Sequence, residues 1–245
     1  MSTKTRARKV GTSSVKKNTS SLLFAPTFEW TEKQKIILDT MNYGKTNCVI
    51  INALAGTGKT TLAIYSALQH LQKGLIDKIL YIRTPVEASH SKLGYLKGDL
   101  ETKFSPYAEI LFEKLREFLS EQEIASLIAE KKVEAAPVAF LRGHDFKRTI
   151  VIVDETQNLY MNEIMTVATR IAVGSKLFVL ADEDQCDLPK KDQDEFMKFA
   201  RLFNDNSSME NGIFYFELKD EMDVMRSDFV RYISKKYSVY KKTLA

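Results

Sequence analysis

The sequence has few cysteines and few histidines, which excludes several kinds of site. Its two cysteines, Cys48 and Cys186, belong to no CxxC pair, and its three histidines are scattered at positions 70, 90 and 144. We therefore expect no zinc site, no disulfide and no histidine-based catalytic triad. Both thiols are expected to be reduced.

Long hydrophobic runs are also missing. No apolar run approaches the ~20 residues needed to span a bilayer, and the N-terminus has no apolar signal-peptide segment. With 44% hydrophobic and 28% charged residues in 245, the composition is typical of a soluble globular protein with a substantial core. We expect no membrane partner and a cytosolic location.

Acidic residues are absent from segment 1–20, which holds six Lys and Arg residues. The positive charge of these six residues is slightly larger than the net charge of the whole chain, +4, so the rest of the chain is close to neutral. The segment is rich in Ser, Thr and Lys with almost no apolar residues, which predicts a disordered tail. Such a tail either binds phosphate backbones through its charge or is only a solubilising leader, and its residues leave both interpretations open.

Short apolar segments alternate with helical patterns along the rest of the chain. Buried strands are predicted at 47–52, 78–83, 149–155, 176–182 and 212–218, and helices at 32–41, 60–74, 107–119, 121–132 and 162–172. The alternation predicts one α/β domain over 21–245, with a mostly parallel sheet flanked by helices. Residues 86–145 are expected to form an insertion of loop and helices between the second and third strands.

The strand at 47–52 runs directly into a phosphate-binding pattern. The pattern G-x-x-x-x-G-K-[ST] fits at Gly58, Lys59 and Thr60, but Ala53 replaces its first glycine. In such a loop, backbone N–H groups and the start of the next helix bind phosphates. Lys59 is expected to reach the β- and γ-phosphates, and Thr60 to bind magnesium. The predicted nucleotide-binding residues of the loop are Ala55, Gly56, Thr57, Gly58, Lys59, Thr60 and Thr61.

Acidic residues follow two later strands. TIVIVDE ends in Asp154 and Glu155, the form of a Walker B strand, in which the aspartate holds magnesium and the glutamate activates the attacking water. The strand KLFVLAD then continues into EDQCDLP, which places Asp182 and Gln185 at the same edge of a parallel sheet. Gln185 is a candidate to contact the γ-phosphate or the lytic water. The implied ligands are ATP and Mg²⁺.

In this order the motifs resemble the PhoH family of P-loop ATPases. The resemblance rests on AGTGKTTLA, VEASHSKLGYLKGDLETKFSPY, EAAPVAFLRGHDF, VIVDETQN, TRIAVGSKLFVLADEDQCDLP and DVMRSDF, and covers about residues 27–238. It implies a RecA-like P-loop core close to the superfamily 1 helicases. The short chain is similar to phage-type members, which implies the cytosol of a bacterium or of a phage-infected cell.

The resemblance also implies roles that the residues alone do not show. Gln34 would match the adenine-reading glutamine of this group, which implies ATP rather than GTP. Gln157 would couple the state of the nucleotide to nucleic acid, and Gln185 would contact the γ-phosphate. Thr31 and Gln34 independently form a capping-box pattern at the start of the first helix.

Basic residues are the candidates for contacts in trans and with nucleic acid. Arg226 matches the family's late arginine and, like Arg170, is a candidate transition-state arginine, with a plain salt bridge as the alternative for each. A homo-hexameric ring is implied by family analogy, since the chain has residues for one RecA lobe. Candidate nucleic-acid contacts are the basic tail together with Arg83, Lys92, Lys97 and Arg142.

Three departures from the family pattern accompany the resemblance. Ala53 and Ala181 each replace a glycine, and Ser89-His90 replace a small and acidic pair. Superfamily 1 helicases commonly carry alanine at the first position, so hydrolysis remains compatible with Ala53.

The leading hypothesis is an ATPase that remodels or moves on RNA or single-stranded DNA. The alternative is an ATP-dependent switch acting on a protein partner, and a small-molecule kinase is disfavoured because no acceptor motif is present.

Overall fold

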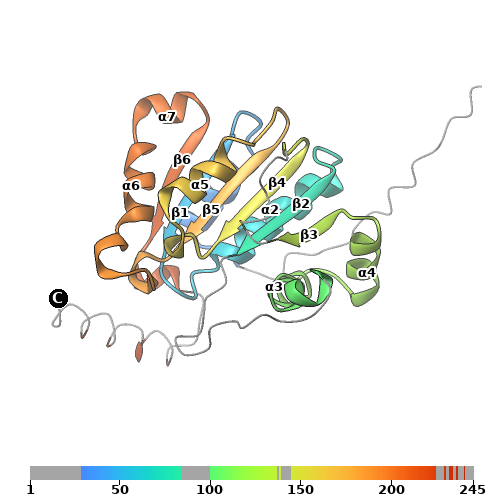
Figure 1. Ribbon diagram of the computed structural model, residues 1–245, viewed down its shortest axis with the longest axis horizontal. Helices are drawn as coiled ribbons and strands as arrows, with labels where there is room; N and C mark the ends of the chain where they lie inside the picture. Colours follow the sequence, from blue (N-terminus) through green and yellow to red (C-terminus); the bar gives the residue numbers. More distant parts are fainter. Residues whose placement is uncertain are drawn as a thin grey trace, which may run out of the picture.

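A six-stranded sheet forms the centre of the protein, as seen in a computed structural model (Figure 1). The structure describes residues 29–83, 100–136, 138 and 145–224, with five single residues at 229, 232, 233, 236 and 240. All five strand pairings are parallel, in the order β3-β2-β4-β5-β1-β6. The strands are β1 Cys48–Ala53, β2 Lys78–Arg83, β3 Val133–Ala136, β4 Thr149–Asp154, β5 Lys176–Ala181 and β6 Ile213–Leu218.

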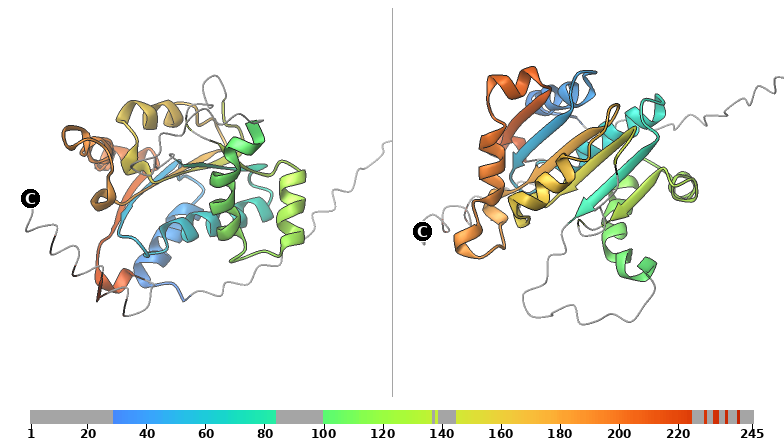
Figure 2. Two further views of the ribbon diagram at one scale, coloured as in Figure 1. Left: turned by 60° about the horizontal axis from the view of Figure 1, so that its bottom comes forward. Right: turned by 45° about the horizontal axis from the view of Figure 1, so that its top comes forward.

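Helices cover both faces of this sheet. They are α1 Glu32–Asn42, α2 Lys59–Gln72, α3 Leu100–Leu115, α4 Glu121–Ala129, α5 Met161–Ala168, α6 Glu195–Leu202 and α7 Asn206–Glu210. One apolar core joins the sheet to α1–α4, and a second joins the opposite face to α5 and α6. In Figure 2, left, the blue and cyan helices α1 and α2 lie below the sheet and the gold helix α5 lies above it.

The central strands are buried from end to end because both faces are covered. In β1, Val49 and Ile51 belong to one core, while Cys48 and Ile50 belong to the other. β4 and β5 are buried along their whole length in the same way. The five predicted strands are confirmed within one residue at each end, and the predicted RecA-like α/β fold class is confirmed with them.

The inserted helices differ from their predicted bounds. The first runs over Leu100–Leu115, not 107–119, so it includes Pro106. At its end the N–H groups of Phe118 and Leu119 both donate to the Leu115 carbonyl. This turn replaces the last helical residues that apolar periodicity predicted.

The second inserted helix is shorter than the predicted 121–132, and a strand follows it. Lys131 has a left-handed backbone with φ 55, and the N–H of Lys132 donates to the Leu127 carbonyl. These features form a Schellman turn, which usually contains glycine at the left-handed position. Because a lysine stands there, no sequence signal marked the stop. The residues from Val133 onward then pair with β2 as the edge strand β3.

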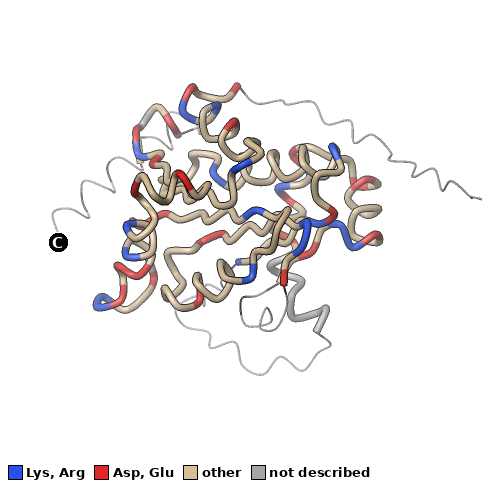
Figure 3. Tube along the Cα trace, turned by 90° about the horizontal axis from the view of Figure 1, so that it is seen from above, with Lys and Arg blue, Asp and Glu red and all other residues tan. Residues whose placement is uncertain are grey.

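Charge is distributed evenly over the described chain. Figure 3 shows Lys and Arg residues mixed with Asp and Glu around the molecule. Within the described residues, no helix combines the length and the apolar character that crossing a membrane requires. Because every strand is parallel, the carboxyl ends of all strands meet at one edge, where the loops after β1, β4 and β5 come together.

Candidate nucleotide-binding site

The loop between β1 and α2 has the conformation that a phosphate loop requires. Gly56 and Gly58 take φ values of 84 and 75, a region that side chains with a Cβ rarely occupy. Between them Thr57 is fully buried, and its hydroxyl donates to the Leu54 carbonyl at 2.8 Å. The glycines therefore stand at the two positions where the turn needs them.

Ala53, in the place of the first glycine, is the last residue of β1. It pairs with Leu218 of β6, is 1% exposed, and is not among the described residues with positive φ. A strand position of this kind accepts a methyl side chain without strain. The replacement of glycine therefore leaves the phosphate loop undamaged.

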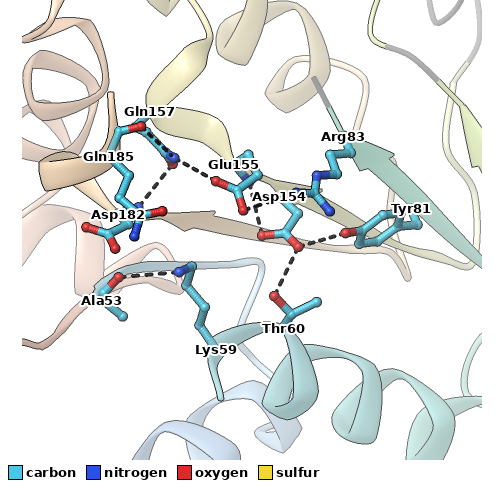
Figure 4. A network of polar contacts seen from close by, with 10 residues as sticks. All are labelled: Ala53, Lys59, Thr60, Tyr81, Arg83, Asp154, Glu155, Gln157, Asp182 and Gln185. Carbon is cyan, nitrogen blue, oxygen red and sulfur yellow. Dashed lines mark hydrogen bonds and ion pairs between the residues drawn. The ribbon is translucent and has the colours of Figure 1, made fainter. Parts of the chain in front are cut away.

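Lys59 opens α2 and lies beneath the sheet edge (Figure 4). Its ammonium group donates to the Ala53 carbonyl at 3.4 Å, and the residue is 9% exposed. Across from it, burial raises the pKa of the Asp182 carboxyl, and the charge of Lys59 partly offsets this rise. Lys59 is thus held at the mouth of the phosphate loop, beside the loop that follows β5.

Asp154 is the centre of the polar network, and it accepts three hydrogen bonds. Its Oδ2 atom accepts from the Thr60 hydroxyl at 3.0 Å and from the Tyr81 hydroxyl at 2.7 Å. Its Oδ1 atom accepts from the backbone N–H of Glu155 at 3.0 Å. The residue is 3% exposed. The structure thus brings together the two residues predicted to bind magnesium, and it adds Tyr81, which the sequence reasoning did not identify.

Glu155 lies next to this centre and is held on both carboxylate oxygens. Gln157 donates to Oε2 at 2.7 Å, and the guanidinium of Arg83 lies 3.5 Å from Oε1. The Glu155 side chain is 22% exposed, so solvent still reaches it. Gln157 also accepts from the Asp182 N–H at 3.0 Å and donates to the Gln185 carbonyl at 3.4 Å. One glutamine therefore connects the loop after β4 with the loop after β5.

Gln34 lies beneath the phosphate loop rather than in an open pocket. Its amide nitrogen donates to the Thr57 carbonyl at 2.9 Å, and its oxygen accepts from the Thr31 N–H at 2.8 Å. The residue is fully buried. The predicted capping box is confirmed. In this conformation the Gln34 side chain links the start of α1 to the phosphate loop, and adenine reading stays a prediction.

Other candidates lie apart from the centre. The Thr61 hydroxyl donates to Glu117 at 3.1 Å, beyond α3. The Arg170 guanidinium donates to the Thr166 carbonyl at 2.5 Å, and the Arg170 carbonyl accepts from Phe146, which precedes β4. Arg170 therefore lies at the opposite edge of the sheet from its own chain's phosphate loop. The basic tail 1–20 and four candidate residues fall outside the described residues: Lys92, Lys97, Arg142 and Arg226.

Comparison with known proteins confirms the resemblance read from the motifs. A family model described as PhoH-like protein matches residues 29–238. PhoH-like proteins of Synechocystis sp. and of Bacillus subtilis are each 36% identical over 183 residues, which is 75% of this chain. The chain spans about half the length of these relatives, 54% and 56% respectively.

Solved structures give weaker likenesses. Unliganded Pif1 from Bacteroides sp. is 16% identical with a TM-score of 0.38, over 82% of this chain and 43% of that one. Domain III of the Thermotoga maritima replication initiation protein DnaA is 14% identical with a TM-score of 0.36, over 82% and 71%. These scores are low, so no statement about function follows from them.

Proposed function

The chain belongs to the PhoH-like protein family, and we propose that it is a magnesium-dependent ATPase that couples hydrolysis to RNA or single-stranded DNA. The observation that carries the proposal is the contact between the Thr60 hydroxyl and Asp154 Oδ2 at 3.0 Å. It joins the phosphate loop to the strand that supplies the acidic pair. Lys59 and Glu155 lie close to this contact (Figure 4).

Phosphate binding follows from the loop and from the helix behind it. Gly56 and Gly58 leave backbone N–H groups free to turn towards an anion, and α2 adds the positive end of its dipole. Lys59 would exchange the Ala53 carbonyl for the β- and γ-phosphates, which are stronger partners for an ammonium group. Gln34 would read the adenine or, through Thr57, set the position of the loop.

The residues at the centre fit a magnesium ion. The Thr60 hydroxyl and the Asp154 carboxylate are hard oxygen donors at neighbouring positions, and Mg²⁺ is typically bound by one or two such groups together with substrate phosphates. A bound ion would neutralise charge on the phosphates. The protein's own part is to hold these two oxygens at the end of the phosphate loop.

Glu155 would take a proton from the attacking water. Its carboxylate is 22% exposed and adjoins the site, while Arg83 and Gln157 fix its orientation. Gln185, in the loop joined to Gln157, would contact the γ-phosphate or that water.

Coupling of ATP hydrolysis to nucleic acid would depend on Arg83, Glu155 and Gln157. Arg83 ends β2 and lies against the glutamate, with its side chain 22% exposed. A nucleic-acid phosphate that attracts Arg83 would change the surroundings of Glu155, and Gln157 would pass the change to the loop after β5. The remaining proposed contacts are the basic tail, Lys92, Lys97 and Arg142. We place the protein in the cytosol, as a homo-oligomeric ring.

ATP turnover measured with and without RNA and single-stranded DNA tests the proposal. Either nucleic acid is expected to raise the turnover rate. Lys59→Ala is expected to lower it by roughly 100-fold or more, because one phosphate-stabilising group is lost. Glu155→Gln is expected to retain bound ATP through gel filtration.

Exposed residues provide the matched controls. Lys73→Ala, at the far end of α2, and Glu210→Gln, at the end of α7, should leave turnover unchanged. Normal turnover in Lys59→Ala would refute the assignment of the site. Turnover that ignores both nucleic acids and responds only to a protein partner would instead support the switch hypothesis.

A further inference from the structure

Tyr81 places the only hydroxyl of β2 inside the predicted magnesium site. The residue is fully buried, and its hydroxyl donates to Asp154 Oδ2 at 2.7 Å. In the register of the sheet, Tyr81 pairs with Ile152 and Arg83 pairs with Asp154. The phenol therefore reaches forward by two pairs to Asp154, the residue that ends the neighbouring strand (Figure 4).

The three donors to Asp154 have different origins. The Glu155 N–H belongs to the next residue, and the Thr60 hydroxyl belongs to the phosphate loop. The Thr60 oxygen is itself the expected metal ligand, so its bond to Asp154 must adjust when a metal enters. Tyr81 is not an expected metal ligand. The Glu155 N–H holds Oδ1, and Tyr81 is the donor that can hold Oδ2, the oxygen next to Thr60, both with and without a bound ion.

We propose that Tyr81 is a positioning residue for the magnesium ligand Asp154 and thereby sets the Mg²⁺ concentration that nucleotide binding requires. This inference rests on the proposed function. Terminal carboxylate torsions are broad, so a carboxylate that loses the donor to one of its oxygens samples more orientations. Outer partners that orient a metal ligand commonly affect metal affinity by 10–100-fold.

A structural role alone would have a different signature. A buried phenol needs a hydrogen-bond acceptor, and Asp154 supplies one whether or not a metal binds. If that were the whole role, removal of the hydroxyl would change stability only. Phenylalanine fills the same volume, so Tyr81→Phe separates the two roles.

The test measures binding of a fluorescent ADP analogue during a Mg²⁺ titration, which needs no turnover. In Tyr81→Phe the half-saturating Mg²⁺ concentration is expected to rise roughly 10-fold. Binding in the presence of EDTA should stay close to wild type, and the unfolding temperature of the ligand-free protein reports separately on the loss of the buried hydrogen bond. Tyr65→Phe removes a hydroxyl from another buried tyrosine in the same core and should leave the Mg²⁺ requirement unchanged.

Two results would overturn the inference, and they are distinguishable. If wild type needs Mg²⁺ and Tyr81→Phe needs the same concentration, the positioning role is wrong while the proposed function stands. If wild type shows no Mg²⁺-dependent nucleotide binding, the proposed function fails and the inference fails with it. Tyr81→Leu, which also lacks the hydroxyl, serves the same comparison if the Phe variant does not fold.

Discussion

Glu155 combines a strained backbone with a proposed catalytic side chain. Its φ and ψ of 55 and 38 lie in the left-handed region, which costs a residue with a Cβ about 1–2 kcal/mol. The N–H held by Asp154 and the carboxylate held by Gln157 keep it there. Strain of this kind persists where the surrounding contacts determine the conformation.

The strain predicts an order of stability among Glu155 variants. Glu155→Ala and Glu155→Gly both remove the carboxylate, but only glycine relieves the left-handed backbone. We expect Glu155→Gly to be more stable than Glu155→Ala by about 1 kcal/mol, and both to lose ATP turnover. Urea unfolding monitored by circular dichroism measures the difference. Equal stability, or a more stable alanine variant, would contradict the assigned strain.

For single residues, those in contiguous motifs can be predicted from the sequence, whereas contacts between residues on neighbouring strands cannot. Lys59, Thr60 and Asp154 lie in patterns that can be read along the chain, because each stands at the end of an apolar strand or in the loop-to-helix motif after one. Tyr81 is part of an apolar strand and is linked to Asp154 only through the register of β2 and β4. A sequence pattern without that register gives no reason to select this tyrosine.

Among the elements, buried strands are the most predictable part of this fold. Their runs of β-branched and apolar residues follow from burial on both faces. The edge strand β3 was not predicted because its sequence VEAA is short, contains two alanines and a glutamate, and is only partly buried. It becomes a strand through pairing with β2, which is a tertiary effect.

The start of β5 anchors the connection between α1 and β1 through a buried lysine. Lys176 is 8% exposed, and its ammonium donates to the carbonyls of Tyr43 at 2.6 Å and Thr46 at 2.9 Å. Loss of solvation lowers the pKa of Lys176 to about 8 from its ordinary value of 10.5. Two N–H donors are enough for the two carbonyls, so the neutral amine also fits the site.

This lysine predicts a pH-dependent contribution to stability. Between pH 8 and 10.5 the unfolded chain binds a proton at Lys176 that the folded chain does not bind, so stability rises with pH. The free energy of unfolding of wild type minus that of Lys176→Met should therefore increase across this window and be constant below it. Urea titrations at several pH values measure the difference.

Burial lowers the pKa of the neighbouring His70, which is thus neutral throughout the window. A pH-independent difference would show that Lys176 titrates normally.

At the scale of the whole molecule, the order of strands brings the site together. β5 lies between β1 and β4, so the loop that carries Asp182 and Gln185 emerges between the phosphate loop and Asp154. The alternation of strands and helices predicts a parallel sheet, but it does not predict which strands are neighbours. Arg170, by contrast, lies at the opposite edge, so any contact it makes with a phosphate loop would be with that of another subunit.

A ring in which Arg226 of one subunit completes the site of the next predicts complementation between two inactive variants. Lys59→Ala lacks the phosphate-binding lysine but keeps the arginine, and Arg226→Ala has the reverse defect. An equal mixture, exchanged before assay, should regain roughly a quarter of wild-type turnover, because half of the sites keep Lys59 and half of those face an intact arginine. Each variant alone should stay inactive, and the solution mass of the mixture should match that of the wild-type oligomer. A mixture of normal mass without regained turnover would mean that Arg226 acts within its own subunit or serves only the fold. The same pairing of Lys59→Ala with Arg170→Ala tests the other arginine independently.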